Sequence, residues 1–281
     1  MGIGQDMGKV LDKLKAFMYD KKKDRLGGMD VDRDKILQTI EQVGQIIYGK
    51  EEEIREVMLA FMADGHILLE DIPGVGKTTM ALAFSKSMGL DYRRIQFTPD
   101  VPSPFLVIAT QNPLGSAGTQ SLPEAQIDRF MVSLSIGYPD YKSELQMAMG
   151  IGYQEKLDDL SVILDQNTLL RIQKEICDIY IRKNVYEYMV RLVRATREHP
   201  YLRHGGSPRA TIALVRLARA SAWLKGRTFV VPADVAEQFP YIIRHRIFLN
   251  DQARMESEDK EQVIRDILLS VKRPVLGERR R

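Results

Sequence analysis

The chain has 281 residues, of which 44% are hydrophobic and 28% charged, so it can bury a substantial core in one large domain or two modest ones. Its 41 basic and 38 acidic residues are well mixed and leave a formal net charge of +3, which gives little support for nucleic acid as a partner. The single cysteine excludes an intrachain disulfide, and no run reaches the ~18 apolar residues of a membrane span, so we expect a cytoplasmic protein without a membrane span.

Residues 1–32 are expected to form an N-terminal amphipathic helix and a linker. Apolar residues recur at helical spacing over 5–20, and a run of three lysines and the Gly27-Gly28 pair then end the pattern. Such a helix packs either on the body of the protein or against a partner or membrane surface. We favour the first alternative, and the sequence leaves the second open.

Residues 33–140 alternate between helical and strand patterns. A helical pattern over 31–63, interrupted around 46–49, leads into an apolar strand over 66–70 and a helix over 77–88. Three further strands are expected at 92–97, 105–110 and 131–136. This alternation is typical of a parallel sheet covered by helices, so we predict an α/β domain in this part of the chain.

After Pro139 the helical periodicity dominates. We therefore predict an all-helical domain over 141–275, followed by a short tail over 276–281. The expected helices lie near 141–150, 165–177, 183–198, 208–224, 232–238 and 258–271.

The most informative motif directly follows the strand over 66–70 and reads D-I-P-G-V-G-K-T-T. Gly74 and Gly76 let the backbone N–H groups turn inward and approach a phosphate closely, and the following helix adds its positive N-terminal dipole. Lys77 would then reach the β- and γ-phosphates of ATP, and the Thr78 hydroxyl would bind Mg²⁺. The full pattern G-x-x-x-x-G-K-[ST] is not met, because Asp71 stands at its first position. The predicted nucleotide-binding residues of this loop are Pro73, Gly74, Val75, Gly76, Lys77, Thr78 and Thr79.

Together with further segments in the same order, this loop makes the sequence resemble the MoxR-type AAA+ ATPases. The resemblance spans most of residues 40–275 and implies an AAA+ phosphate-loop domain with a parallel sheet, followed by an all-helical lid domain. The matching segments are I-I-Y-G (46–49), L-L-E-D-I-P-G-V-G-K-T-T (68–79), F-T-P-D (97–100), F-L-V-I-A-T-Q-N-P (105–113), L-P-E-A-Q-I-D-R-F (122–130), G-G-S-P-R-A (205–210) and R-H-R-I (244–247).

The resemblance implies roles for single residues. Asn112 would be sensor 1, which places the attacking water, Arg129 the arginine finger offered to a neighbouring subunit, and Arg209 sensor 2, which reaches from the lid to the γ-phosphate. Such groups suit a phosphoryl transfer, in which the protein positions the reactants and neutralises charge. Each has a structural alternative: Asn112 as a turn residue before Pro113, Arg129 as a surface arginine, and Arg209 as a first-turn residue after Pro208. Adenine would be cupped by Ile47, Tyr48 and Gly49.

The resemblance also implies the partners. ATP and Mg²⁺ would be the cofactors, and the chain would associate with itself into a ring, by resemblance a hexamer. ATP hydrolysis would be coupled to the remodelling or maturation of client proteins, which in this family include proteins with von Willebrand factor A domains. Other AAA+ relatives act on DNA, but the near-neutral charge argues against a nucleic-acid motor here.

One departure from the family pattern concerns the chemistry itself. In the family, the F-T-P-D stretch is followed by a strand that carries the Walker B acids, Asp and Glu, and by the pore loops. Here only the seven residues Thr98–Pro104 connect the strands expected at 92–97 and 105–110. A parallel crossover needs about a dozen residues or more, so seven residues cannot supply one. Either the two strands form a distorted antiparallel pair, or one of them leaves its family position.

Without the acidic strand, the Thr78 hydroxyl is a thin protein contribution to a Mg²⁺ site, and the nearest acid at a strand end is Asp100. Metal and electrostatic effects carry most of this reaction, so we expect ATP turnover by this chain to be severely impaired. The alternative to an active ATPase is therefore a degenerate module that binds ATP without hydrolysing it and regulates or joins an assembly.

Overall fold

The computed structural model describes residues 28–72, 74–93, 106–111, 122–149 and 153–275. Residues 28–44 form its first helix, so the predicted linker ends earlier than expected and the boundary predicted after residue 32 falls inside a helix. Asp32 is buried on this helix and makes two hydrogen bonds of 2.7 and 2.8 Å with the guanidinium of Arg171. This bidentate pair fixes the helix to the body of the protein.

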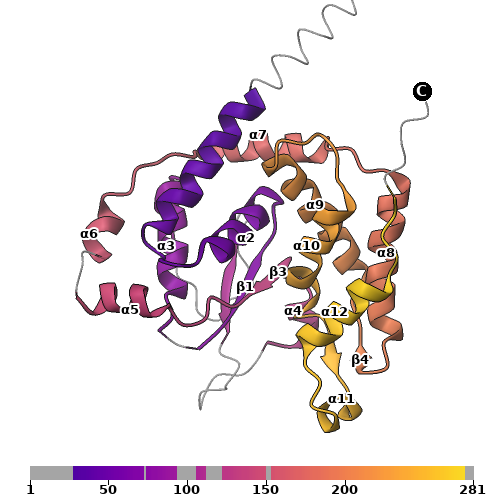
Figure 1. Ribbon diagram of the computed structural model, residues 1–281. Helices are drawn as coiled ribbons and strands as arrows, with labels where there is room; N and C mark the ends of the chain where they lie inside the picture. Colours follow the sequence, from indigo (N-terminus) through magenta and orange to yellow (C-terminus); the bar gives the residue numbers. More distant parts are fainter. Residues whose placement is uncertain (1–27, 73, 94–105, 112–121, 150–152, 276–281) are drawn as a thin grey trace, which may run out of the picture.

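A three-stranded parallel sheet in the order β2-β1-β3 lies at the centre of the molecule (Figure 1). The central strand β1 (Ile67–Glu70) pairs with β2 (Ile108–Gln111) on one side and with β3 (Val132–Leu134) on the other. Three consecutive side chains of β1 are completely buried, as expected for a central parallel strand that is covered on both faces. The prediction of a parallel, helix-covered sheet is confirmed for these three strands.

The second predicted strand, over 92–97, is absent from the two of its residues that the structure describes. Residues 92 and 93 have no strand structure, and residues 94–97 lie outside the described residues, as does the connection 98–104. The two arrangements predicted for that connection therefore stay predictions.

Two helices cover the sheet close to the loop that follows β1. α2 (Glu51–Met62) precedes the sheet, and α3 (Lys77–Ser87) follows the loop. The rings of Phe61 on α2 and Phe84 on α3 meet edge to face with centroids 5.2 Å apart, an arrangement that contributes beyond the area it buries. The short helix α4 (Glu124–Ile127) then leads into β3.

The second half of the chain is helical, as predicted. Its main helices are α7 (Gln166–Cys177), α8 (Lys183–Glu198), α9 (Pro208–Leu224), α10 (Pro232–Ile243) and α12 (Lys260–Ser270), and their core contains the fully buried side chains of Tyr188, Trp223 and Phe239. The short elements that the sequence pattern did not predict include α11 (Asp251–Met255) and the antiparallel pair β4 (Leu202–His204) and β5 (Phe248–Leu249). Such short segments show no clear periodicity. Among the described residues, no helix is long and apolar enough to cross a membrane.

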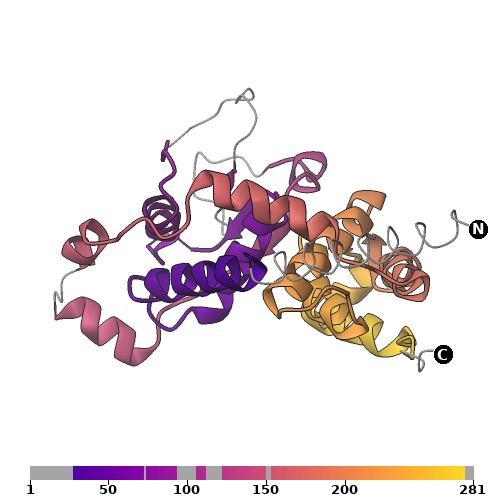
Figure 2. The ribbon, with the colours of Figure 1, turned by 90° about the horizontal axis from the view of Figure 1, so that it is seen from above.

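The helices α5 (Tyr141–Ala148) and α6 (Tyr153–Asp158) lie on the far side of the sheet from α8–α12 (Figures 1 and 2). Lys86 on α3 forms a 2.6 Å ion pair with Asp158, and the Gln42 amide donates a hydrogen bond of 2.9 Å to the Ser161 carbonyl. The first part of the predicted helical domain therefore packs on the α/β unit rather than with the other lid helices.

Candidate functional site

The loop after β1 has the backbone of a phosphate cradle. Gly74 and Gly76 have φ angles of +88° and +92°, a region that side-chain-bearing residues rarely adopt. A Cβ added at either glycine would meet nothing within 4 Å, so the space beside the loop is open to a ligand. Gly76 is also the N-cap of α3, where no side chain caps the helix. The first N–H groups of α3 are thus left for an anion.

Lys77 stands at the first position of α3, and its ammonium group folds back over the loop. Its Nζ donates hydrogen bonds to the carbonyl oxygens of Asp71 and Ile72, the second at 3.0 Å. Burial lowers the pKa of Lys77, and the nearby Asp71 carboxylate opposes this shift. Thr78 beside it is exposed, and Pro73 lies outside the described residues.

Asp71 explains the departure of this loop from the full glycine pattern. Its buried carboxylate accepts hydrogen bonds from the Gly137 N–H at 2.6 Å and the Ser135 hydroxyl at 3.1 Å, and also from the Ile72 N–H at 2.9 Å. The side chain thereby ties the start of the loop to the segment after β3. The sequence pattern contained no signal for this contact, because its partners lie more than sixty residues away.

The segment predicted to cup adenine lies next to the same place. Gly49 has a φ of +67°, and a Cβ there would come within 3.3 Å of the Asp140 carboxylate. The Lys50 ammonium donates a hydrogen bond of 3.0 Å to the Tyr138 carbonyl. Segment 137–140 therefore contacts both the predicted adenine segment and, through Gly137, the phosphate loop.

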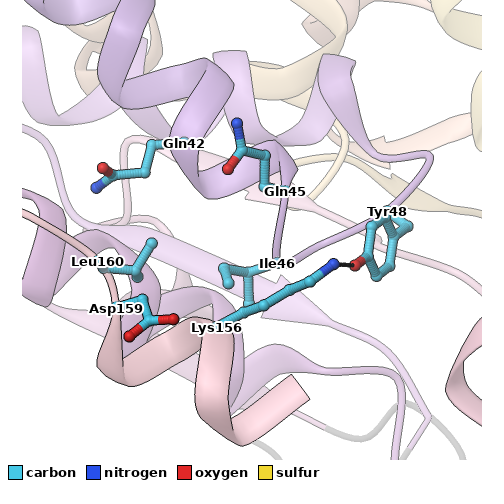
Figure 3. A pocket seen from close by; sticks show the side chains of 7 residues that line it. All are labelled: Gln42, Gln45, Ile46, Tyr48, Lys156, Asp159 and Leu160. Atoms are coloured by element: carbon cyan, nitrogen blue, oxygen red, sulfur yellow. Dashed lines mark hydrogen bonds between the residues drawn. The ribbon is translucent and has the colours of Figure 1, made fainter. Parts of the chain in front are cut away.

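A pocket of about 350 Å³ opens beside Tyr48, between the end of the first helix and α6 (Figure 3). The Lys156 ammonium donates a hydrogen bond to the Tyr48 hydroxyl and lies 5.1 Å from the centre of its ring. Ile47 is buried instead of facing this pocket, so only Tyr48 of the three predicted adenine residues lines it. The lining residues are Gln42, Gln45, Ile46, Tyr48, Lys156, Asp159 and Leu160.

The two predicted arginines lie at the opposite edge of the sheet from the phosphate loop. Arg129 precedes β3, whose first residue, Val132, pairs with Ile67 at the beginning of β1, whereas the loop follows the end of β1. The Arg209 guanidinium donates a hydrogen bond of 3.2 Å to Asp128, so it lies at the same edge as Arg129. Both side chains are exposed. Parallel strands keep their two ends at opposite edges of the sheet, so both arginines lie at the edge remote from the phosphate loop of their own chain. The role of Arg209 toward a γ-phosphate stays a prediction.

Asn112 lies outside the described residues. Its neighbour Gln111 ends β2 opposite Glu70, and the Gln111 carbonyl accepts a hydrogen bond of 3.0 Å from the Asp71 N–H. The chain thus leads to the position of Asn112 from the same edge of the sheet as the phosphate loop.

The site suits the phosphates better than the metal. The two glycines and the uncapped start of α3 fit an anion, but Glu70 accepts a hydrogen bond of 2.6 Å from Ser133, and Asp71 is fully engaged as described. Among the residues described, no group of three or more His, Cys, Asp or Glu side chains could hold a metal ion. Among the described residues of the loop, the Thr78 hydroxyl would be the side-chain group available to bind Mg²⁺.

Two family models match the chain in the order of its two parts. The model described as the ATPase family associated with various cellular activities (AAA) matches residues 66–104 and 100–132, and the AAA lid domain model matches residues 194–267. The first match breaks at 100–104, inside the short connection where the sequence predicts that the acidic strand is missing.

Relatives match most of the chain. The uncharacterized protein YeaC of Bacillus subtilis is 32% identical in an alignment that covers 84% of this chain and 94% of YeaC. Chaperone MoxR1 of Mycobacterium tuberculosis is 29% identical in an alignment that covers 83% of this chain and 81% of MoxR1. The alignment with YeaC spans 303 positions, whereas 84% of 281 residues is about 236, so about 67 positions of YeaC have no counterpart here.

A solved structure supports the same assignment. The crystal structure of a candidate ATPase from Cytophaga hutchinsonii matches with a TM-score of 0.82 and a sequence identity of 30%. The match covers 91% of this chain and 99% of that one. With the phosphate loop and the helical lid in the family's order, these matches show that the chain belongs to the MoxR-type AAA+ ATPase family.

Proposed function

We propose that the chain binds ATP at the loop between β1 and α3. The observation that carries this proposal is the pair of positive-φ glycines that leads into the uncapped helix α3, with Lys77 at its first position. The open space beside both glycines admits the phosphates, and the Lys77 ammonium needs only to leave two backbone carbonyls to meet them. Segment 47–49 would hold the adenine, since it and the loop contact the same segment after β3.

The chain would work as one subunit of a ring. Arg129 and Arg209 lie at the edge of the sheet remote from their own phosphate loop, so a head-to-tail neighbour would present them to the next subunit's nucleotide. The family's cycle of ATP binding and hydrolysis would remodel or mature client proteins in the cytoplasm, and the short connection 98–104 would impair the hydrolysis step in this chain. Relatives named MoxR, one of them a chaperone, support this role, and clients with von Willebrand factor A domains are the class that the resemblance suggests.

ATP binding tests the central step of this proposal. Lys77→Ala removes the charge that would meet the phosphates, and a charge-assisted hydrogen bond contributes about 1.5–3 kcal/mol, so we expect the affinity to fall by at least ~10-fold. Titration calorimetry with ATP and Mg²⁺ measures this. Lys86→Ala on the same helix removes an exposed ion pair with Asp158 and should bind as the wild type does. Equal affinity of the Lys77→Ala chain would place the nucleotide elsewhere.

A second candidate function is an ATP-binding module that does not turn ATP over. It is favoured by the short connection 98–104, by the split of the family match at that point and by the unmatched positions of YeaC. This module would use ATP as a structural ligand that favours assembly. It differs from the first candidate in one observable, the release of phosphate from bound ATP.

A further inference from the structure

We infer that Asp128 is a positioning residue, which sets the direction of Arg209 at the edge offered to the neighbouring subunit. The inference rests on the proposed function, because it assumes that Arg209 acts on a neighbour's nucleotide. Asp128 directly precedes Arg129 in the turn between α4 and β3.

Asp128 holds Arg209 directly through its carboxylate and indirectly through the Ser207 cap of α9. The Asp128 carboxylate accepts a 3.2 Å hydrogen bond from the Arg209 guanidinium and bonds of 2.9 and 3.0 Å from the Ser207 hydroxyl. That hydroxyl caps α9 by accepting a hydrogen bond of 3.2 Å from the Arg209 N–H. The carboxylate therefore fixes the start of α9 together with the charged tip of its second residue.

A second arginine anchors Asp128 from inside the protein. The Arg246 side chain is only 2% exposed, and its Nε donates a hydrogen bond of 3.0 Å to the Asp128 carboxylate. Its Nη2 donates another of 3.1 Å to the Asp128 carbonyl, and its Nη1 donates one of 3.1 Å to the Met131 carbonyl. The turn that carries Arg129 is thus fastened to the lid from the buried side.

The carboxylate also separates two like charges. The Arg246 guanidinium is buried and the Arg209 side chain is 59% exposed. The two positive charges repel each other. Burial lowers the pKa of Arg246 to about 10, Asp128 opposes this shift, and Arg209 adds to it. Without the negative charge between them, repulsion would turn the exposed Arg209 away while the buried Arg246 stays in place.

The exposed pair contributes little to stability, because water screens an ion pair of this kind. Its effect should therefore appear in the geometry of Arg209 and not in the folding of the chain. The buried Arg246–Asp128 pair is different, since loss of one partner leaves an unpaired charge. This contrast makes the two roles of Asp128 separable.

The test is a double-mutant cycle of Asp128→Asn and Arg209→Ala in the full chain. The readout is the affinity for a fluorescent, slowly hydrolysed ATP analogue with Mg²⁺, measured at rising chain concentration. If a neighbour completes the site, binding tightens as the chains assemble. We expect Arg209→Ala and Asp128→Asn each to reduce this gain in affinity by ~10-fold. The double variant should show the same reduction as either single variant.

Thermal unfolding of the same variants separates positioning from structure. Asp128→Asn should lower the unfolding midpoint equally in both backgrounds through Arg246, while Arg209→Ala should leave it nearly unchanged. Should Asp128→Asn fail to fold, Ser207→Ala keeps both charges and should reduce the tightening by ~3-fold only when Arg209 is present. The control is Glu124→Gln, which removes the exposed 2.7 Å ion pair with Arg203 at the same edge and should bind as the wild type does.

The failures are distinguishable. If Arg209→Ala leaves the concentration dependence intact, the proposed role of Arg209 toward a neighbour is wrong, and the inference falls with it. If Arg209→Ala removes the tightening but Asp128→Asn does not, or if the two losses multiply, only the positioning role of Asp128 is overturned.

Discussion

At the scale of single residues, the most unusual group is a buried carboxyl between the α/β unit and the lid. Glu56 on α2 is 1% exposed and accepts a hydrogen bond of 3.3 Å from the Gln238 amide on α10. Within the described residues, Glu56 Oε2 and Gln238 Oε1 have no hydrogen-bond partner. Burial raises the pKa of Glu56 to about 7, with Gln238 and Arg55 opposing the shift and the carboxylates of Glu237 and Glu52 adding to it. A protonated Glu56 supplies the donor that these two oxygens lack.

This pKa predicts a stability that falls as the pH rises. Below about pH 4.5 Glu56 is protonated in both the folded and the unfolded chain, and between 4.5 and about 7 only the folded chain holds the proton. The contribution is therefore lost over this range and amounts to about 3 kcal/mol. Urea unfolding at pH 5 and pH 8 should show this loss for the wild type relative to Glu56→Gln, whose amide does not titrate. Glu51→Gln at the exposed start of α2 is the control, and a pH dependence shared by both variants would contradict the assignment.

At the scale of elements, the glycine pair before α9 shows how the lid places its arginine. The Gly206 N–H donates a hydrogen bond of 2.8 Å to the Thr196 hydroxyl near the end of α8, and Arg197 donates one of 2.8 Å to the Gly206 carbonyl. A Cβ at Gly205 would lie 2.5 Å from the backbone carbon and oxygen of Thr196. The close approach of this segment to α8 therefore requires glycine, and it fixes where α9 begins.

We predict that Gly205→Ala lowers the free energy of unfolding by about 3 kcal/mol, because the contact is with backbone atoms that cannot rotate away. Thermal or urea unfolding measures this loss. Gly44→Ala is the matched control, since a Cβ there meets nothing within 4 Å and the residue is helical, so this variant should be as stable as the wild type or up to about 1 kcal/mol more stable. Equal stability of both variants would mean that the chain relaxes around the added methyl group.

The elements themselves were largely predictable, but their long-range contacts were not. The phosphate loop was identified because its chemistry lies in one short stretch, and the lid helices were found because each has a helical period of more than two turns. The Asp71–Gly137 bond and the cluster around Asp128 join residues far apart in the sequence, which no local pattern records. The same reason explains why the sequence pattern assigns α6 to the lid, although its Asp158 pairs with Lys86 on α3. α10 also continues through Pro240 to Ile243, beyond its predicted end at 238.

At the scale of the whole molecule, the phosphate loop and the arginine edge lie at opposite ends of a central strand of four residues, roughly 13 Å long. In the proposed ring, Arg129 and Arg209 would therefore face the nucleotide of a neighbouring subunit. Each chain would then supply the phosphate loop for its own nucleotide and the charge-neutralising arginines for its neighbour's. The family match divides at 100–104, within the connection where the sequence predicts that the acidic strand is missing.

The most direct measurement is phosphate release by the 281-residue chain at an ATP concentration that saturates binding. A chimera in which the corresponding segment of YeaC replaces residues 98–104 provides the comparison. We predict that the chain binds ATP but releases phosphate at the background rate, and that the chimera is faster by ~10²-fold or more, because charge stabilisation by metal and protein groups carries most of the reaction. Turnover by the unaltered chain at the rate of the chimera would contradict the account, since another residue would then supply the acidic function.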